Sequence, residues 1–344
     1  GILARMWPNV ARAVAFMDSL RVSRQTAEFQ SGEKRVFYGL MPQSISHEGY
    51  SAKPMHSYWD DFFALRGFKD ATEIARILGK PEAARYSAIR DEFRRDFYAS
   101  IQLSMKQHGI DYIPGAAELG DFDATSTTVG VSPAGELARL PQPALSRTFE
   151  KYLENFRNRR DSATWEIYTP YEWRVVGTLV QMGQKADAHE VADFFFEHQR
   201  PAAWHHWAEV VWRDPLTPKF IGDMPHTWVG SDFIRSTLDM FAFERESDSS
   251  LVIGAGIPEN WLRDDGVAIR GLSTHYGRLD YSMRRAGSAL EVKIGEGVRI
   301  PPGGLVVRSA FDNAPTGAEV NGVAAERAGE VIVRSLPAIV RFRY

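Results

Sequence analysis

The spacing of the apolar residues changes once along this chain, and that change constrains its fold more than any other feature. In the first part, apolar residues such as Ile2, Met6 and Val10 recur at helical spacing. Beyond about residue 250 they alternate instead, as Leu279 and Tyr281 do, and Gly and Pro interrupt the pattern at short intervals. The sequence therefore predicts a mainly α-helical part followed by a β domain, which we expect to be a β-sandwich.

Two domains are expected from the length as well as from the pattern. The chain has 344 residues, and single hydrophobic cores usually stop growing near about 250 residues. We place the helical domain at residues 1–248 and the β-sandwich at residues 249–344.

The helical part is predicted to consist of helical hairpins joined by long loops. Gly79 and Gly183 mark the turns between paired helices, and Pro81 suits the first position of the helix that follows it. Long irregular segments between helices often carry function. Helices are expected over residues 2–20, 58–78, 81–101, 142–157, 170–182, 184–199 and 227–243, and long loops over residues 21–56, 107–133 and 200–226.

The composition excludes several kinds of site. The chain contains no Cys, so disulfides, a thiolate metal site and a cysteine nucleophile are excluded. The formal net charge is -3, which supports neither nucleic-acid binding nor a basic membrane-binding face. The adjacent His205 and His206 lack an evident third ligand, and no cofactor-binding motif is present, so neither a metal nor a cofactor is predicted.

Aromatic residues are concentrated in the helical part. The chain has nine Trp, and seven of them lie between Trp59 and Trp228. Flat apolar rings suit the C–H faces of sugar rings, although many large aromatic side chains simply fill cores. The concentration of Trp therefore suggests a carbohydrate-binding surface, which polar residues nearby have to support.

The first candidate site lies where the loop before residue 58 leads into a helix. Trp59 is followed by two carboxylates, Asp60 and Asp61, and preceded by His56. A carboxyl group held against an indole is poorly solvated, which raises its pKa toward the range that a general acid needs. The alternative is that one of the two Asp residues caps the helix. Because two adjacent acids exceed what a cap requires, Asp60 or Asp61 is a candidate general acid.

A second candidate site lies in the loop that follows the last helical hairpin. Glu209 stands among Trp204, His205 and Trp207. An isolated Glu among aromatic residues needs a polar purpose, which is either an ion pair with Arg213 or the activation of a water molecule. The second purpose makes Glu209 a candidate general base.

Two further segments offer carboxylates. Trp165, Glu166 and Tyr168 are typical of a wall that contacts sugars, and Glu166 is a second candidate base. Glu172 follows shortly afterwards and has the alternative of interacting with a helix dipole. Residues 120–128 are rich in Asp, Ser and Thr, which either bind sugar hydroxyls or form an ordinary structured loop.

The order of these segments resembles the six-hairpin glycosidases, the (α/α)6-toroid group of glucoamylases, trehalases and α-L-rhamnosidases. In glucoamylases the general acid follows a Trp in a Trp-Glu-Glu segment; here the run from Trp59 to Phe63 stands in that place, with Asp60 at the acid's position. Trehalases are similar to this chain in using Asp as the acid. Glu209, ahead of a Thr-Trp helix start at Trp228, resembles the segment that holds the catalytic base.

The resemblance implies a fold and a reaction. Residues 271–279 look like the strand motif that follows the toroid in α-L-rhamnosidase-like proteins. The implied activity is inverting hydrolysis of a glycosidic bond in an oligo- or polysaccharide, with Asp60 as acid and Glu209 as base, roughly 6.5–9.5 Å apart. The alternatives are a phosphorylase or polysaccharide lyase of the same fold, or a non-catalytic glycan-binding module. The expected substrate contacts are His56, Trp59, Trp165, Tyr168, Trp204, His205, Trp207 and Trp228.

The resemblance also implies a partner. In toroids of this group several helices precede the acid, whereas one clear helix precedes Asp60 here. We therefore expect an N-terminal portion of the same protein to complement this chain, either as a cleaved segment or as part of another molecule. The other expected partner is a carbohydrate substrate, with no nucleic acid and no membrane, and the resemblance favours a periplasmic or secreted location.

Overall fold

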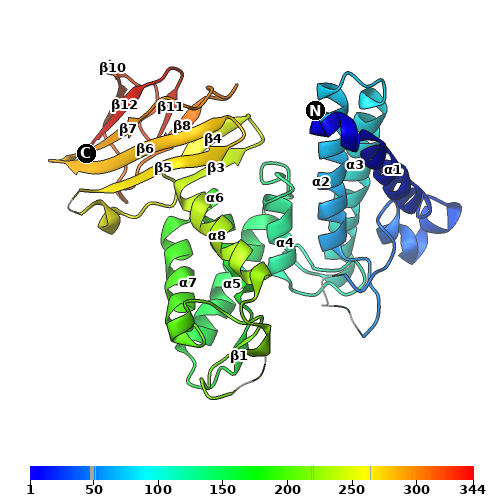
Figure 1. The fold of residues 1–344 in the computed structure, drawn as a ribbon. Helices are drawn as coiled ribbons and strands as arrows, with labels where there is room; N and C mark the ends of the chain where they lie inside the picture. The colour runs from blue at the N-terminus through cyan, green and yellow to red at the C-terminus, as the bar shows by residue number, and fades with distance from the viewer. Residues whose placement is uncertain (47–49, 51, 218, 220, 264) are drawn as a thin grey trace. The chain divides into compact units, whose positions relative to one another are not determined.

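The chain forms two compact units, residues 1–155 and residues 156–344 (Figure 1). The computed structural model describes residues 1–46, 50, 52–217, 219, 221–263 and 265–344. The described residues include eight α-helices and twelve β-strands, and every strand from the third onward lies after residue 241. The predicted order of helical hairpins followed by a β domain is thereby confirmed.

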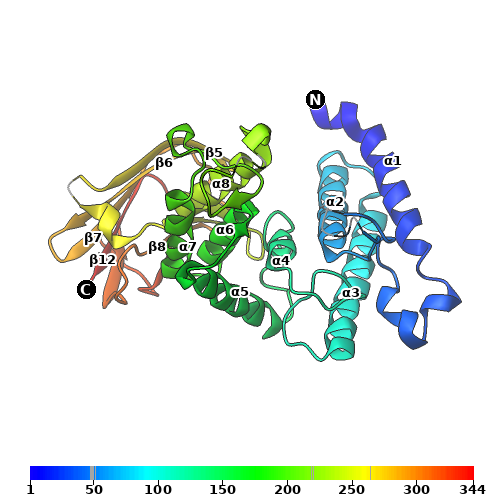
Figure 2. The same cartoon turned by 90° about the horizontal axis from the view of Figure 1, so that it is seen from below.

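The first unit is built around a helical hairpin. Helix α2 (Tyr58–Ile77) and helix α3 (Ala83–His108) lie side by side, and the chain turns between them at Gly79, which has a φ of 62°. Helix α1 (Ile2–Val22) packs against both (Figures 1 and 2). Two short 3-10 helices, η1 (Ala27–Phe29) and η2 (Gly32–Phe37), follow α1.

Aromatic side chains fill the interface between α2 and α3. Phe62 and Phe68 of α2 and Phe93 and Phe97 of α3 are completely buried. The rings of Phe62 and Phe97 meet edge to face with centroids 4.8 Å apart, and those of Phe68 and Phe93 do so at 5.4 Å. This is the arrangement that the helical spacing of apolar residues predicts, because residues three or four positions apart share one helix face.

Two details of the first unit differ from the prediction. Helix α3 begins at Ala83, two residues after the proline at position 81. Helix α4 (Ala124–Val131) lies within the segment predicted to be a loop. Its Thr, Val and Gly residues have low helix propensity, but seven of its eight residues are buried, so packing overrides propensity here.

The second unit contains a second helical hairpin. Helix α5 (Ala144–Asp161) carries the chain from the first unit into the second. Helix α6 (Trp173–Gln181) and helix α7 (Lys185–Glu197) form the hairpin, turning at Gly183 as predicted. Helix α8 (Thr227–Phe241) packs against α6 and leads directly into the first strand of the β domain. The short elements between them are β1 (Ile167–Tyr168), η3 (Pro170–Glu172), η4 (Ala202–Trp204), β2 (Val211–Trp212) and η5 (Ile221–Asp223).

The β domain consists of two sheets, and it confirms the predicted β-sandwich. Neighbouring strands are antiparallel except β4 and β8, which pair in parallel. One sheet has the order β11 (Glu330–Val333), β8 (Leu305–Arg308), β4 (Ser250–Ile253) and β3 (Ala242–Arg245), and the other has the order β10 (Val323–Ala324), β9 (Gly317–Val320), β12 (Ala338–Arg343), β7 (Ala289–Ile294), β6 (Gly277–Ala286) and β5 (Val267–Thr274). A 3-10 helix, η6 (Glu259–Leu262), follows β4.

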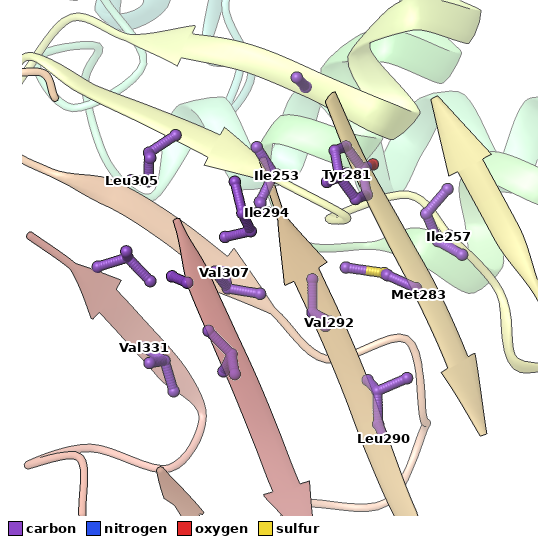
Figure 3. Packing of buried hydrophobic residues seen from close by; sticks show 14 of the residues in the cluster. Ile253, Ile257, Tyr281, Met283, Leu290, Val292, Ile294, Leu305, Val307 and Val331 are labelled. Atoms are coloured by element: carbon purple, nitrogen blue, oxygen red, sulfur yellow. The ribbon is translucent and has the colours of Figure 1, made fainter. Parts of the chain in front are cut away.

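Apolar side chains from the two sheets meet in one core (Figure 3). Ile253 and Val307 come from the four-stranded sheet, and Met283 and Val292 come from the six-stranded sheet; all four are completely buried. In β12 every second residue is buried, as the period of two requires when one face of a sheet is covered. The alternation seen in the sequence therefore identifies the inner face of each strand.

Among the described residues, none of the helices combines the length and the apolar character that crossing a membrane requires.

Candidate functional site

Asp60 lies in the first turn of α2 and is partly exposed. Two hydroxyls from the loop before the helix hold its carboxyl group: Ser46 donates to one oxygen at 3.0 Å, and Ser44 donates to the other. The loop is itself fixed by a β-bridge between Ser44 and Met55. The long loop before α2 therefore holds both oxygens of the Asp60 carboxyl group, while the residue stays partly exposed.

Whereas Asp60 is partly exposed, the neighbouring Asp61 is buried. Its side chain is completely buried, and one oxygen accepts the backbone N–H of Met41 at 2.9 Å. The other oxygen, Oδ2, has no hydrogen-bond partner among the described residues. Burial, with Asp60 and Glu118 nearby, raises the pKa of Asp61 well above its ordinary value, and its side chain has no access to solvent.

Neither Asp acts as the cap of α2. The residue at the cap position is Ser57, and no side chain makes the capping hydrogen bond. Trp59, which precedes the two acids in the sequence, is almost completely buried and contacts the Phe63 ring with centroids 5.3 Å apart. The capping alternative is therefore wrong for both acids, and each carboxyl group has a different partner.

His56 is held by a carboxylate that sequence reasoning did not single out. Glu118 accepts the His56 backbone N–H through both oxygens, at 3.1 Å and 3.0 Å, and its Oε1 lies 2.5 Å from His56 Nδ1. The His56 ring stacks on Phe37 with centroids 4.3 Å apart. Because only 4% of His56 is exposed, its ring fixes the start of α2 and has little surface for a substrate.

Glu118 itself is ionised in this arrangement. Burial favours the neutral form, but hydrogen bonds from His56 and Gln43 outweigh it, and the pKa of Glu118 lies below its ordinary value. No local sequence pattern predicts this contact, because His56 and Glu118 are far apart along the chain and meet where residues 56–58 pair with residues 115–117.

The carboxylates of residues 120–128 are occupied by structural hydrogen bonds. Asp121 accepts the backbone N–H of Ala116 at 2.9 Å and the Tyr50 hydroxyl at 3.0 Å. Asp123 caps α4 by accepting the backbone N–H of Ser126 at 3.1 Å. Of the two alternatives for this segment, the contacts favour the structured loop.

In the second unit, Glu209 is partly exposed and lies just before β2. Its backbone oxygen accepts the Thr169 hydroxyl at 3.1 Å, and its Oε1 accepts the Tyr171 hydroxyl at 3.4 Å. In the described part of the chain Arg213 does not pair with Glu209, and its guanidinium lies 6.0 Å from the centre of the Trp165 ring. The contacts therefore do not support the ion-pair alternative for Glu209.

The other two candidate acids of this unit, Glu166 and Glu172, differ in exposure as Asp60 and Asp61 do. The side chain of Glu166 is exposed, and its backbone oxygen accepts the Arg213 N–H at 2.8 Å. Glu172 is buried and makes a two-bond ion pair with Arg159, at 2.8 Å and 2.7 Å. Glu172 is thus a structural residue. The Glu166 side chain is exposed to solvent, and among the described residues no group positions it for catalysis.

The predicted aromatic contacts divide into surface and core residues. Trp204 is 59% exposed and Trp228 is 48% exposed, whereas Trp207 is completely buried and Tyr168 is nearly so. Trp207 packs against Trp173 and donates its indole N–H to the Phe195 backbone oxygen at 2.8 Å. A substrate can reach Trp204 and Trp228 directly, while Tyr168 and Trp207 hold the helices together.

The two remaining predicted contacts, Trp165 and His205, are both accessible to solvent. Trp165 is partly exposed and packs edge to face on Tyr168 and His198. His205 is exposed and has a φ of 51°, at the end of η4. In the described residues no group of three or more His, Cys, Asp or Glu side chains is arranged to hold a metal ion.

Comparison with known proteins gives the fold. Neither a protein-family model nor a curated protein matches the sequence. Among solved structures, an α-L-rhamnosidase from Streptomyces avermitilis complexed with L-rhamnose matches all of this chain and 31% of its own, with 13% identity and a TM-score of 0.55. The chain has an α-L-rhamnosidase-like glycosidase fold.

A second α-L-rhamnosidase, from Dictyoglumus thermophilum, matches 100% of this chain and 37% of its own, with 12% identity and a TM-score of 0.47. This chain thus spans about a third of the length of the α-L-rhamnosidases that it matches. The rhamnosidase-like fold confirms the predicted fold class, in which a helical toroid-like part precedes a β-sandwich.

Proposed function

We propose that this protein is a glycoside hydrolase that acts by inversion, with Asp60 as the general acid and Glu209 as the general base. The main support is the rhamnosidase-like fold across the whole chain.

Asp60 suits the acid because both forms of its carboxyl group can be accommodated. A general acid gives its proton to the leaving oxygen and is left as a carboxylate. The hydroxyls of Ser44 and Ser46 contact both oxygens, and a hydroxyl can either donate or accept a hydrogen bond. Burial disfavours the charged form of Asp61 next to it, which limits the negative charge beside the ionised product.

Glu209 suits the base because one of its oxygens is held and the other is not. Tyr171 contacts Oε1 at 3.4 Å, and among the described residues no group hydrogen-bonds Oε2. A base that removes a proton from water needs a free lone pair on a positioned oxygen, and Oε2 meets that need.

The substrate that we propose is an oligo- or polysaccharide with an apolar sugar face. Trp204 and Trp228 expose indole surface in the same unit as Glu209, and such surfaces pack on the C–H faces of sugars. L-Rhamnosides are the first substrates to try, because the Streptomyces avermitilis structure is described as complexed with L-rhamnose.

The test is the release of reducing sugar from a panel of glycans that begins with L-rhamnosides. We expect Asp60→Asn and Glu209→Gln each to lower kcat by about 10²- to 10⁴-fold, the usual contribution of an acid or base, while the exposed control Glu154→Gln keeps wild-type activity. NMR of the first-formed anomer decides whether the reaction inverts the configuration.

Other outcomes of the same experiment would replace the proposal. Turnover only with added phosphate indicates a phosphorylase, and an unsaturated product indicates a lyase. Glycan binding that is unaffected by both variants, without any turnover, indicates a non-catalytic binding module.

A further inference from the structure

We infer that His226 and Tyr171 form a directional hydrogen-bond chain that positions Glu209, with its direction set by the N-terminus of α8. The inference rests on the proposed function, because it gives both residues a role in holding the general base. Neither residue is among the site residues expected from the sequence.

The hydrogen bonds of His226 determine which of its two ring nitrogens carries the proton. His226 is the cap residue of α8, and its Nδ1 accepts the backbone N–H of Val229 at 3.4 Å. A backbone N–H can only donate a hydrogen bond, so Nδ1 carries no proton. In a neutral imidazole the proton then resides on Nε2.

The position of this proton determines the direction of the hydrogen bond between His226 and Tyr171. His226 Nε2 lies 3.5 Å from the Tyr171 hydroxyl. Because Nε2 carries the proton, it donates and the hydroxyl oxygen accepts. The hydroxyl proton of Tyr171 is then directed away from His226 toward Oε1 of Glu209, 3.4 Å away.

The ring of Tyr171 is restrained by the groups around it. The rings of His226 and Trp228 contact it edge to face, with centroid distances of 5.7 Å and 5.4 Å. The Arg174 guanidinium lies 4.8 Å from its centre and is held by Asp232 at 2.7 Å. A tyrosine hydroxyl restrained in this way can hold a carboxylate in one orientation.

Backbone hydrogen bonds also fix Glu209 and His226, the two ends of the hydrogen-bond chain. Thr169 donates its hydroxyl to the Glu209 backbone oxygen at 3.1 Å and accepts the Tyr171 N–H at 3.4 Å. His206 Nε2 lies 3.2 Å from the His226 backbone oxygen. Tyr171 and Glu209 therefore keep their relative position, and Oε2 of Glu209 is left to accept a proton.

The structural part of the inference is tested by ¹⁵N NMR of the histidine side chains in the full chain. We expect His226, assigned by its loss in His226→Asn, to carry its proton on Nε2. Tyr171→Phe should shift the Nε2 signal and leave the Nδ1 signal nearly unchanged. The control Tyr276→Phe, which changes a tyrosine in the β domain, should shift neither. A proton on Nδ1 of His226, or unchanged His226 signals in Tyr171→Phe, would refute the proposed hydrogen-bond chain.

The functional part is tested by kinetics on the substrate found with the glycan panel. Tyr171→Phe should lower kcat by about 10- to 100-fold, the range for loss of a hydrogen bond to a charged group, with KM changed far less. His226→Asn should act in the same direction while keeping a favourable cap residue for α8. Unchanged kcat in both variants would refute the positioning role.

Failure of the proposed function and failure of the positioning role give different results. If the wild-type protein cleaves no glycan, the proposed function fails, but the NMR result still decides whether the hydrogen-bond chain from His226 to Glu209 exists. If glycans are cleaved and Glu209→Gln is inactive but Tyr171→Phe is fully active, the proposed function stands and the positioning role is wrong.

Discussion

At the scale of single residues, adjacent acids have opposite environments. Asp60 is partly exposed and held by Ser44 and Ser46, while Asp61 is completely buried. Consecutive residues of a helix point in directions about 100° apart, so one turn can place one carboxyl group at the surface and its neighbour in the core. The pair is therefore one candidate acid and one structural residue.

Asp61→Asn should change how stability depends on pH. Burial raises the pKa of Asp61 in the folded protein above its unfolded value of about 3.9. The stabilising contribution of the neutral carboxyl group is then fully present below the unfolded pKa and is lost as the pH rises toward the folded pKa. Asn cannot ionise, so the variant should gain stability relative to wild type as the pH rises above about 4 toward the folded pKa of Asp61.

Urea unfolding at several pH values measures this difference. The exposed control Glu154→Gln should follow the wild-type curve. Parallel curves for wild type and Asp61→Asn would mean that Asp61 is not neutral in the folded protein. If Asp61→Asn removes glycan cleavage while Asp60→Asn does not, the two acids exchange their proposed roles.

A buried ion cluster in the first unit should dominate acid sensitivity. Glu136 is completely buried and accepts hydrogen bonds from Lys69 at 2.7 Å, from Arg94 at 2.8 Å and 2.9 Å, and from Tyr98 at 2.7 Å. Burial alone would raise the pKa of Glu136, but the hydrogen bonds from Arg94 and Lys69 hold it below its ordinary value. The carboxylate is thus the charged centre of the cluster.

Glu136→Gln should destabilise the protein by about 3–5 kcal/mol, the cost of leaving a buried cation without its partner. In wild type the folded pKa lies below the unfolded value of about 4.3. The cluster therefore contributes fully above the unfolded pKa and loses its contribution as the pH falls through the folded pKa. Urea unfolding at pH 7 measures the loss; a change no larger than that of Glu154→Gln would contradict it.

At the scale of elements, helix α4 exists because of its neighbours. Gly130 of α4 lies against α2, and a Cβ atom there would meet Phe62 Cε1 at 2.6 Å. Phe62 is completely buried, so it has no room to move aside. The glycine is needed for the close approach of the two helices, although it lowers the helix propensity of α4.

Gly130→Ala and Gly67→Ala should have opposite effects. At Gly130 the added methyl group should cost about 1–3 kcal/mol through overpacking. At Gly67 of α2 the added Cβ would meet only the end of the flexible Met17 side chain, at 3.2 Å, so the gain in helix propensity, up to about 1 kcal/mol, should prevail. Thermal unfolding of both variants measures the contrast, and equal shifts would contradict it.

At the scale of the whole molecule, the β domain derives its stability from one core between two sheets. Phe342 of β12 is completely buried in it, whereas Ile339 of the same strand points outward and is 37% exposed. Phe342→Ala should cost about 3–5 kcal/mol and Ile339→Ala much less. Urea unfolding followed by CD distinguishes the two; similar losses would mean that the inner face of β12 is assigned incorrectly.

The type and order of the elements followed from the sequence. The hairpin helices α2, α3, α6 and α7, their turns at Gly79 and Gly183, and the alternating strands were all predicted. A hydrophobic period depends only on residues a few positions apart, so it can be recognised without knowing what the element packs against. The exception, α4, is short and has low propensity, and only its burial makes it a helix.

Which of the candidate residues face solvent was decided by the tertiary structure alone. Trp204 and Trp207 look equivalent in the sequence, yet the first is exposed and the second is completely buried. His56 meets Glu118, and Glu209 meets Tyr171, only because segments far apart in the chain are brought together. Exposure and hydrogen-bond partners are set by such distant contacts, so the sequence determined which chemical groups are available and the fold decided which of them can reach a substrate.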